Sequence, residues 1–195
     1  MGTLALPPLR TPEEYLELDR NSEFKHEYLD GAVIEMSGGT INHSTIRTNT
    51  SGLLWRALDG SSCEVHSDVR VSPPGGRTYC FPDVFVICGK PRFKGDRSDT
   101  VENPVLIVEV LSNSTSDYDQ GVKFRRYRSI PELRQYVLFA QDEPYVMVYS
   151  KTEQGFWLLA EYSGLDKTIH LDSVDITLPL TAVYRGVEFP AAAAD

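Results

Sequence analysis

The sequence predicts an α+β domain in which a mixed β-sheet is flanked by helices and preceded by an N-terminal helix and a β-hairpin. The apolar run 105–111 is rich in β-branched residues and indicates a central strand that is covered on both faces. Asp30-Gly31 joins two short strand-like runs, which is a strong type I′ hairpin signal. Strands and helices do not alternate regularly enough for a doubly wound sheet. The chain has 195 residues, which suits one domain, expected at 11–190 with loose ends at 1–10 and 191–195.

Two helices are expected around the hairpin in the first part of the chain. Thr11 caps a helix that runs to about residue 20, since Pro12 suits the first helical position and Glu14 can close a capping box. The hairpin strands are expected at 24–29 and 32–36. A second helix is expected at 42–58, with Asn42 as a candidate cap. Its apolar positions are Ile46, Leu53, Leu54, Trp55 and Leu58.

Most of the remaining signals indicate strands. A weakly alternating strand at 63–71 and a Pro-Gly turn precede a short apolar strand at 84–87. A polar, basic loop at 89–103 leads to the central strand 105–111. Ser116 is a plausible cap for a helix that runs to about residue 128. Later strands are expected at 136–140, 145–149 and 156–161.

The net charge of the chain excludes one functional class. The chain has 28 acidic and 19 basic residues, which gives a net charge of −9. Proteins that coat nucleic acids are usually basic because they neutralise phosphates, so a small basic groove is the most that we expect. Basic residues gather at 90–97 and 120–134, and the alternative for each group is a solvated surface.

Cysteine usage and the N-terminus favour the cytoplasm. No apolar run reaches the roughly 18 residues of a membrane helix, and the first residues do not resemble a secretory signal. Cys63, Cys80 and Cys88 form no CxxC pair, which argues against a disulfide framework and for a reducing compartment. A zinc site that begins with Cys63 and His66 is a weaker alternative than small buried cysteines. We therefore expect a cytoplasmic protein without membrane contacts.

Two carboxylates lie in strands that can pair. Glu109 interrupts the apolar run 105–111, where an ionised carboxylate without a partner costs several kcal/mol to bury. Asp83 follows Pro82 and opens the strand at 84–87. If the strands pair, both carboxylates lie near one point and form a hard-cation site suited to Mg²⁺. The alternatives are an arginine ion pair for Glu109 and ordinary turn chemistry for Asp83.

Lys123 shares one face of the predicted helix with Asp119 and Tyr127, because the three are spaced i, i+4 and i+8. Its ammonium is expected near the metal site, where it can hold a water molecule and offset charge on a phosphate. The alternative is a surface pair between Asp119 and Lys123, with Tyr127 packing at the edge.

Two further candidates come from the first part of the chain. Across the predicted turn Glu27 faces Ile34, so this carboxylate lies on the apolar face of the hairpin and requires a partner. His43 lies in the first turn of the second predicted helix, where a histidine tends to be neutral. His43 is a candidate base, and the alternative is an ordinary polar residue of a first turn.

These residues carry a resemblance to a known family. The strings FPDVFV at 81–86 and PVLIVEVLS at 104–112, followed by Ser114-Thr115, Asp119, Lys123 and Tyr127, resemble the Uma-type family of restriction-endonuclease-like proteins. That family was formerly a domain of unknown function and belongs to the PD-(D/E)XK nuclease superfamily. The string HEYLDG at 26–31 and the following His43 also fit. The resemblance covers residues 11–150 and implies a restriction-endonuclease-like core.

The resemblance also implies a metal site and one departure from the usual pattern. Asp83 and Glu109 match the metal-binding carboxylates, the backbone carbonyl of Val110 is a further ligand, and Glu27 matches an additional acidic ligand. The implied cofactor is Mg²⁺, with Mn²⁺ as a substitute. The usual lysine position, two residues after the glutamate, is Leu111. The resemblance implies that Lys123 of the following helix takes that role.

The favoured hypothesis is a Mg²⁺-dependent endonuclease that hydrolyses phosphodiester bonds in DNA, with Asp83, Glu109, Lys123 and Glu27 as catalytic residues. The candidate substrate-contacting residues are His43, Lys94, Arg125, Arg126 and Tyr127. One alternative is a nucleic-acid-binding or regulatory module with weak or no catalysis. The other is a homodimeric interaction protein whose carboxylates are only salt-bridged. A homodimer is expected in any case, because 145–149 and 156–159 carry more apolar surface than one small sheet needs.

Overall fold

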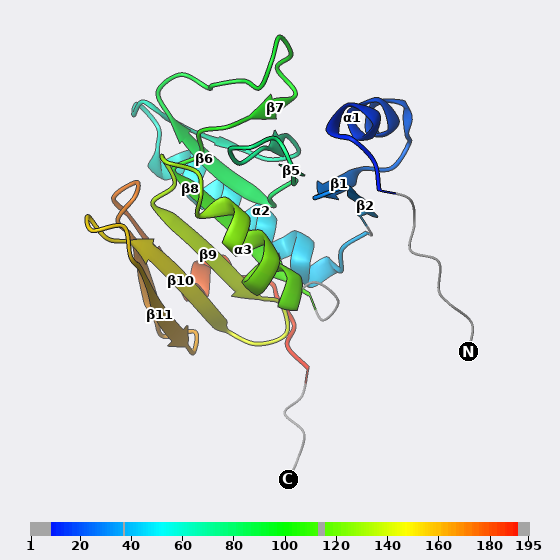
Figure 1. Ribbon diagram of the computed structural model, residues 1–195. Helices are drawn as coiled ribbons and strands as arrows, with labels where there is room; N and C mark the ends of the chain where they lie inside the picture. The colour runs from blue at the N-terminus through cyan, green and yellow to red at the C-terminus, as the bar shows by residue number, and fades with distance from the viewer. Residues whose placement is uncertain (1–8, 37, 113–115, 191–195) are drawn as a thin grey trace.

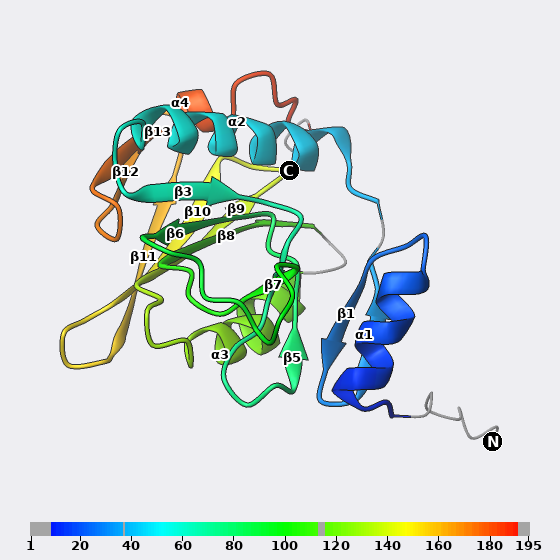
Figure 2. The same cartoon turned by 90° about the horizontal axis from the view of Figure 1, so that it is seen from above.

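A six-stranded mixed sheet with helices on both faces forms the centre of the molecule (Figure 1). The computed structural model describes residues 9–36, 38–112 and 116–190. Helix α2 (Ile41–Ala57) covers one face of the sheet, and α3 (Phe124–Tyr127) covers the opposite face, as the view from above shows (Figure 2). The predicted α+β class with a sheet between helices is therefore confirmed.

The sheet has the strand order β11-β10-β9-β8-β6-β3. Its strands are β3 (Cys63–His66), β6 (Val84–Cys88), β8 (Leu106–Leu111), β9 (Gln135–Ala140), β10 (Tyr145–Lys151) and β11 (Trp157–Ser163). Only β8 and β9 are parallel among these neighbours. A parallel pair requires a crossover, and the segment that contains the π-helix η1 (Tyr118–Lys123) and α3 lies between the two strands. The five strands predicted from residue 84 onward are confirmed within two residues.

The N-terminal unit lies beside the main sheet (Figure 2) and follows the local sequence signals closely. Its elements are α1 (Pro12–Asn21), β1 (His26–Leu29) and β2 (Ala32–Glu35), and β1 also pairs with β5 (Thr78–Tyr79). The predicted capping box forms between Thr11 and Glu14. Asp30 and Gly31 have φ values of 48° and 100°, as a type I′ turn requires. Glu27 pairs with Ile34, so the predicted hairpin register is correct.

Several short elements were not expected from the sequence. Strands β12 (Thr168–Leu171) and β13 (Ile176–Pro179) form a hairpin that is followed by α4 (Leu180–Val183). Buried residues of this segment join the apolar core between α2 and the sheet. The predicted strand 63–71 is divided into β3 and β4 (Arg70–Val71), and β4 pairs in parallel with β7 (Thr100–Val101). The interruption includes Asp68, whose φ of 62° ends the extended conformation.

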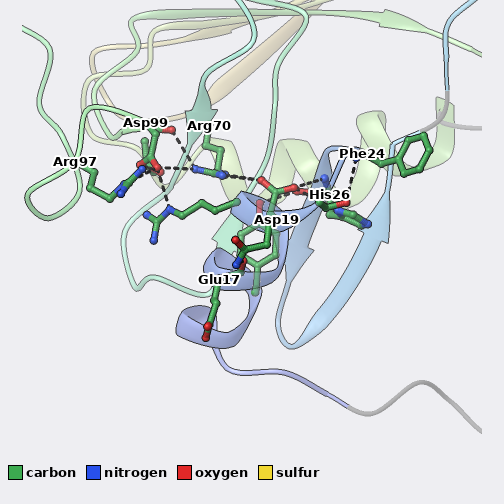
Figure 3. Close-up of polar contacts among 12 residues, drawn as sticks. Glu17, Asp19, Phe24, His26, Arg70, Arg97 and Asp99 are labelled. Carbon is green, nitrogen blue, oxygen red and sulfur yellow. Dashed lines mark hydrogen bonds and ion pairs between the residues drawn. The ribbon is translucent and has the colours of Figure 1, made fainter.

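A network of charged side chains attaches α1 to the β4–β7 pair (Figure 3). The guanidinium of Arg70 donates to Asp19 Oδ2 at 2.6 and 3.1 Å and lies 3.3 Å from Asp99. Arg20 and Arg97 each lie 3.1 Å from the same Asp99 carboxylate. Asp19 and Arg70 are buried. We call these five residues the Arg70 network, and its contacts hold the N-terminal unit against the main body.

The two faces of the sheet carry separate apolar cores. Val84, Val86, Val108 and Val110 belong to the core under α2. Phe85, Ile107, Leu111 and Tyr136 belong to the core under α3. Since side chains alternate along a strand, Glu109 points away from α2, to the side where Lys123 lies. The pleat of β8 therefore explains why the carboxylate and the lysine meet.

Three predictions about helices need correction. Thr40, rather than Asn42, caps α2, because Thr40 Oγ1 accepts a hydrogen bond from the His43 N–H at 3.1 Å. The Asn42 amide instead donates to the carbonyls of Gln141 and Glu188 at 3.2 and 2.8 Å. The segment predicted as a regular helix at 116–128 contains the π-helix η1, which has no side-chain cap bond. Trp55, expected among the packing residues of α2, is 73% exposed.

The prediction that the cysteines form no disulfide is wrong. Cys63 and Cys88 are joined by a disulfide, and Cys80 is free and buried. The two bonded residues lie directly opposite each other in the β3–β6 register. Spacing along the chain carries no information about such a cross-strand pair. Within the described residues, no helix is both long and apolar enough to cross a membrane.

Candidate functional site

A cavity of about 620 Å³ lies where the N-terminal hairpin, the start of α2 and the ends of β6 and β8 meet. Glu27 of β1, Asp83 before β6, Glu109 of β8 and Lys123 of η1 all contribute to its lining. The four residues predicted to be catalytic are therefore brought together from four elements. The volume is in the usual range for ligand sites in proteins, roughly 300–1,000 Å³.

Asp83 and Glu109 lie opposite each other on neighbouring antiparallel strands. The register pairs Val84 with Val108, so residues 83 and 109 are the next positions outward. The Asp83 N–H donates to Glu109 Oε2 at 3.1 Å, and the Val110 N–H donates to Asp83 Oδ2 at 2.8 Å. Each carboxylate is held by the backbone of the other strand. The predicted meeting of the two carboxylates at one end of the sheet therefore occurs, with the N–H of Val110 taking part.

The ammonium of Lys123 lies among three carboxylates. Nζ is 3.0 Å from Glu27 Oε1, 3.2 Å from Glu109 Oε1 and 3.2 Å from Asp119 Oδ1. All four residues are more than nine-tenths buried. Asp119 and Lys123 thus form the i, i+4 pair that the sequence allowed, but the pair is buried and not on the surface. We call these four residues the Lys123 cluster.

Neighbouring groups fix the carboxylates of the cluster in place. The Phe81 N–H donates to Glu27 Oε1 at 3.0 Å, and the Tyr127 hydroxyl donates to Glu109 Oε1 at 3.3 Å. Tyr127 is fully buried, so its hydroxyl contacts Glu109 inside the protein, whereas the sequence suggested contact with substrate. Tyr136 donates its hydroxyl to the Asp119 carbonyl at 3.0 Å, which gives a partner to a backbone group of the π-helix.

The charges of the Lys123 cluster are unbalanced. Burial raises the pKa of Glu109 well above its usual value. Lys123 opposes this rise, and the nearby carboxylates of Asp119, Asp83 and Glu27 add to it. For Lys123, burial disfavours the charged form, but Glu109, Glu27 and Asp119 outweigh this effect, so its pKa is raised well above the usual value. The ammonium therefore stays charged, and the carboxylates together can accept more positive charge than it supplies.

His43 reaches the site from the opposite face of the sheet. Its Nε2 lies 3.2 Å from Asp83 Oδ2, and 20% of its side chain is exposed. The Thr40 cap fixes the first turn of α2 and with it the backbone of His43. The imidazole can orient the Asp83 carboxylate or exchange a proton with a group bound in the cavity. Of the residues predicted to contact the substrate, His43 lies in the lining of this cavity.

The chemistry of the donor set suits a divalent cation. Mg²⁺ and Mn²⁺ take oxygen ligands, and Glu27, Asp83, Glu109 and Asp119 offer carboxylates in one cavity. A cation already lies where three of these meet, namely the Lys123 ammonium. In the part of the chain that the structure describes, no three His, Cys, Asp or Glu side chains are arranged to hold a metal ion as they stand. The residue types therefore suit a divalent cation, and the Lys123 ammonium lies at the point that Glu27, Glu109 and Asp119 share.

Comparison with known proteins decides the family. Residues 12–181 match the family Uma2, described as "Putative restriction endonuclease". The chain is a member of the Uma2 family. Two relatives of this Uma2 protein come from Synechocystis sp. (strain ATCC 27184 / PCC 6803 / Kazusa). Uncharacterized protein slr1290 is 39% identical over 185 residues, which cover 93% of this chain and 95% of the relative. Uncharacterized protein sll1609 is 34% identical over 177 residues, which cover 90% of this chain and 100% of the relative.

A solved structure supports the fold of the Uma2 chain. The crystal structure of a protein from Anabaena variabilis ATCC 29413, described as a putative nuclease belonging to DUF820, matches with a TM-score of 0.75. The match covers 90% of this chain and 97% of the other at 16% identity. At this identity the likeness shows a shared fold, and it agrees with the restriction-endonuclease-like core that the resemblance implied.

The predicted basic residues of the Uma2 chain do not face the cavity. Arg126 forms an ion pair with Asp30, Lys94 lies 3.6 Å from Glu102, and Arg125 is exposed. None of these three belongs to the cavity lining in the described ranges, whereas Arg47 of α2 does. Arg47 was not among the site residues predicted from the sequence. Its position four residues after His43, on the same helix face, is the signal that identifies it.

Proposed function

We propose that this Uma2 protein is a divalent-metal-dependent endonuclease that hydrolyses phosphodiester bonds in DNA. The main observation is the convergence of Asp83 and Glu109 at one end of neighbouring strands, with Glu27 and Lys123 in the same cavity. The family and the nuclease-like fold support a nuclease. The acidic donor set supports the metal, because phosphodiester hydrolysis requires charge stabilisation and an activated water.

Each residue has a role that follows from its position. Asp83 and Glu109 would hold the metal ion, with Glu27 and the Val110 carbonyl as further ligands. Bound Mg²⁺ or Mn²⁺ polarises a phosphate oxygen and lowers the pKa of a coordinated water. Lys123 would offset the negative charge that develops on the phosphate, once its ammonium faces that group. His43 orients Asp83 from the other face of the sheet.

The charge of the cavity also supports a metal-dependent mechanism. The carboxylates in the lining are Glu27, Glu35, Asp83, Glu109 and Asp119, and the permanently charged bases are Lys123 and Arg47. Such an excess of negative charge repels a phosphodiester unless further cations are bound. Divalent cations remove that repulsion. A metal-dependent reaction therefore agrees with the cavity better than a reaction that uses only side chains.

Arg47 is the basic residue best placed to contact the DNA backbone. It lines the cavity, and 38% of its side chain is exposed. Asp68, 3.9 Å away and itself largely exposed, holds it only loosely. We therefore propose that a phosphate next to the scissile one lies along the Arg47 side of α2. Such contacts position a nucleic acid without reading its sequence.

A second candidate function is a nucleic-acid-binding or regulatory module with weak catalysis. The observation that favours it is the engagement of Lys123 with three carboxylates, which draws its ammonium away from any phosphate.

In either case we propose a homodimer. The outer strand β11 and the residue before it expose apolar side chains, with Phe156 70% and Leu158 62% exposed. Light scattering that shows a 21.9 kDa particle at tens of micromolar protein contradicts the dimer.

Plasmid cleavage tests the proposed function. Supercoiled DNA is incubated with the wild type, Asp83→Asn or Asp166→Asn in the presence of Mg²⁺ or Mn²⁺. The last variant is a control, since Asp166 is an exposed carboxylate outside the cavity. We expect nicking by the wild type and the control, and a loss of about 100-fold or more in Asp83→Asn. A wild type that binds Mn²⁺ and DNA but never cleaves supports the second candidate. A wild type that binds neither Mn²⁺ nor DNA supports the interaction protein.

A further inference from the structure

The Lys123 ammonium occupies the point at which the carboxylates of the cavity converge. Its distances to Glu27, Glu109 and Asp119 lie between 3.0 and 3.2 Å. The ring of Tyr118 covers another side, with Nζ 5.5 Å from the ring centroid. The side chain of Lys123 is 8% exposed. The ammonium therefore has the surroundings of a bound cation, supplied by the protein itself.

This arrangement gives the acidic site a counter-charge that comes from the chain itself. Buried carboxylates without counter-ions are strongly destabilising. Glu27 and Glu109 belong to strands of separate sheets, and Asp119 belongs to the crossover segment. Lys123 connects all three elements through one charge. Without metal, its ammonium is the cation that offsets their repulsion.

A divalent cation and this ammonium compete for the same oxygens. Glu27 Oε1 and Glu109 Oε1 both face Nζ, so a metal ion bound to these atoms lies within a few ångströms of the present ammonium position. Two cations at such a separation repel each other strongly in a buried site. Asp119 is on the same π-helix as Lys123. It can therefore keep the ammonium beside the cavity after the contacts with Glu27 and Glu109 are lost.

We infer that Lys123 is a displaceable counter-ion. Its ammonium binds the Glu27 and Glu109 carboxylates in the metal-free protein, and a divalent cation takes its place on these two carboxylates when the site is loaded. The inference rests on the proposed metal-dependent function and adds its regulation. Metal loading is then also the step that frees the ammonium to face a phosphate. A purely catalytic lysine, by contrast, leaves metal affinity unchanged when it is removed.

Calorimetric titration with Mn²⁺ distinguishes these cases without measuring activity. The variants are Lys123→Met, which keeps a long side chain but removes the charge, and Arg125→Met, which removes the same charge from an exposed position nearby. We expect Lys123→Met to bind Mn²⁺ at least about tenfold more tightly than the wild type, because the competing cation is gone. Arg125→Met should stay within about twofold, since exposed charges are screened by solvent.

The outcomes separate this inference from the proposed function. Equal or weaker Mn²⁺ binding by Lys123→Met overturns the counter-ion role, while saturable binding by the wild type keeps the metal-dependent function. If neither protein binds Mn²⁺, both the inference and the metal-dependent function are wrong. Tighter binding by Lys123→Met, with an unchanged Arg125→Met control, supports the inference.

A measurement on the wild type covers the case in which Lys123→Met does not fold. The side-chain ¹⁵N signal of the Lys123 ammonium is followed by NMR while Mg²⁺ is added. We expect the signal to shift as the site saturates, and its hydrogens to exchange faster with water once the contacts with Glu27 and Glu109 are lost. A signal that keeps its position and its protection at saturating Mg²⁺ contradicts displacement.

Discussion

The Arg70 network and the Lys123 cluster are both groups of charged side chains that include buried residues, yet their charges balance differently. In the Arg70 network, two carboxylates face three guanidinium groups (Figure 3), so each carboxylate has at least one cation of its own, and we call such a network balanced. In the Lys123 cluster, three carboxylates share one ammonium, and Asp83 lies next to them. The first group connects α1 to the β4–β7 pair. The second lines a cavity.

The pKa values of one carboxylate in each group shift in opposite directions. Burial acts to raise the pKa of Asp99, but hydrogen bonds from Arg20 and Arg97 and the charge of Arg70 lower it to about 2. Burial raises the pKa of Glu109, and the single ammonium does not reverse this. A balanced network thus stabilises the charged carboxylate and holds elements together. An unbalanced one favours an additional cation, and this difference distinguishes a structural ion network from a candidate metal site.

The largest expected effect concerns the balanced network. Arg70→Met leaves Asp19 buried without its main partner, and removing one partner of a buried ion pair costs about 3–5 kcal/mol. We expect a loss of this size in urea unfolding, and the same loss with and without Mn²⁺, because the network lies outside the cavity. A loss below about 1 kcal/mol, or recovery on addition of Mn²⁺, shows that the two groups are not separate in function.

The pH dependence of stability comes next. The pKa of Asp99 is lowered from its unfolded value of 3.8 to about 2 in the folded protein. Its contribution to stability is therefore fully present above the unfolded value and is lost as the pH falls toward 2. We expect Asp99→Asn to lower stability at neutral pH and to flatten the acid limb of the unfolding curve between these values. An acid limb that matches that of the wild type contradicts the lowered pKa.

A smaller effect is expected for Arg47. Arg47→Ala should weaken DNA binding by roughly fivefold, about 1 kcal/mol, and reduce the salt dependence of binding by about one phosphate contact. Fluorescence anisotropy with Ca²⁺, which also prefers oxygen ligands, measures binding. Arg125→Ala is the matched control on the opposite face of the sheet and should bind like the wild type. If Arg125→Ala weakens DNA binding and Arg47→Ala does not, the basic segment predicted from the sequence is the DNA-contacting surface.

The smallest effect separates the two groups most clearly. Glu109→Gln removes one negative charge from a cluster that has too many, and Glu27 and Asp119 still hold Lys123. We expect the metal-free variant to change stability by less than about 1 kcal/mol, whereas a comparable change in the balanced network costs several times more. Urea unfolding of Glu109→Gln and Asp19→Asn measures this directly. Equal losses in both variants contradict the distinction.

Local signals in the sequence predicted much of this structure. Thr11, Glu14 and Asp30-Gly31 specify their turns and caps through contacts with near neighbours. Glu109 was identifiable because an acidic residue in an apolar strand is costly without a partner. The hairpin register followed from the turn type, and it placed Glu27 correctly. These predictions succeeded because each depends on a few adjacent residues.

The remaining features depend on contacts between distant segments. The Cys63–Cys88 disulfide follows from the register of β3 and β6, and the β12–β13 hairpin follows from burial against α2. Arg126 forms an ion pair with the distant Asp30, and Lys94 lies 3.6 Å from Glu102 of its own loop segment, so their local clustering with other bases did not indicate a groove. Arg47 was missed because a single basic residue on a helix does not indicate a binding site until the cavity beside that helix is known.

Crystals of the wild type soaked with Mn²⁺ provide the most direct test of whether Asp83 and Glu109 bind a metal ion. Anomalous scattering locates the ion independently of any assumption about the site. We expect one strong peak in contact with carboxylate oxygens of Asp83 and Glu109, at about 2.2 Å, with the Lys123 ammonium moved away from Glu109. The same soak of Asp83→Asn should show no peak there, and Asp166→Asn should match the wild type. A cavity without an anomalous peak at saturating Mn²⁺, or with the ion held away from both Asp83 and Glu109, contradicts the proposed metal site.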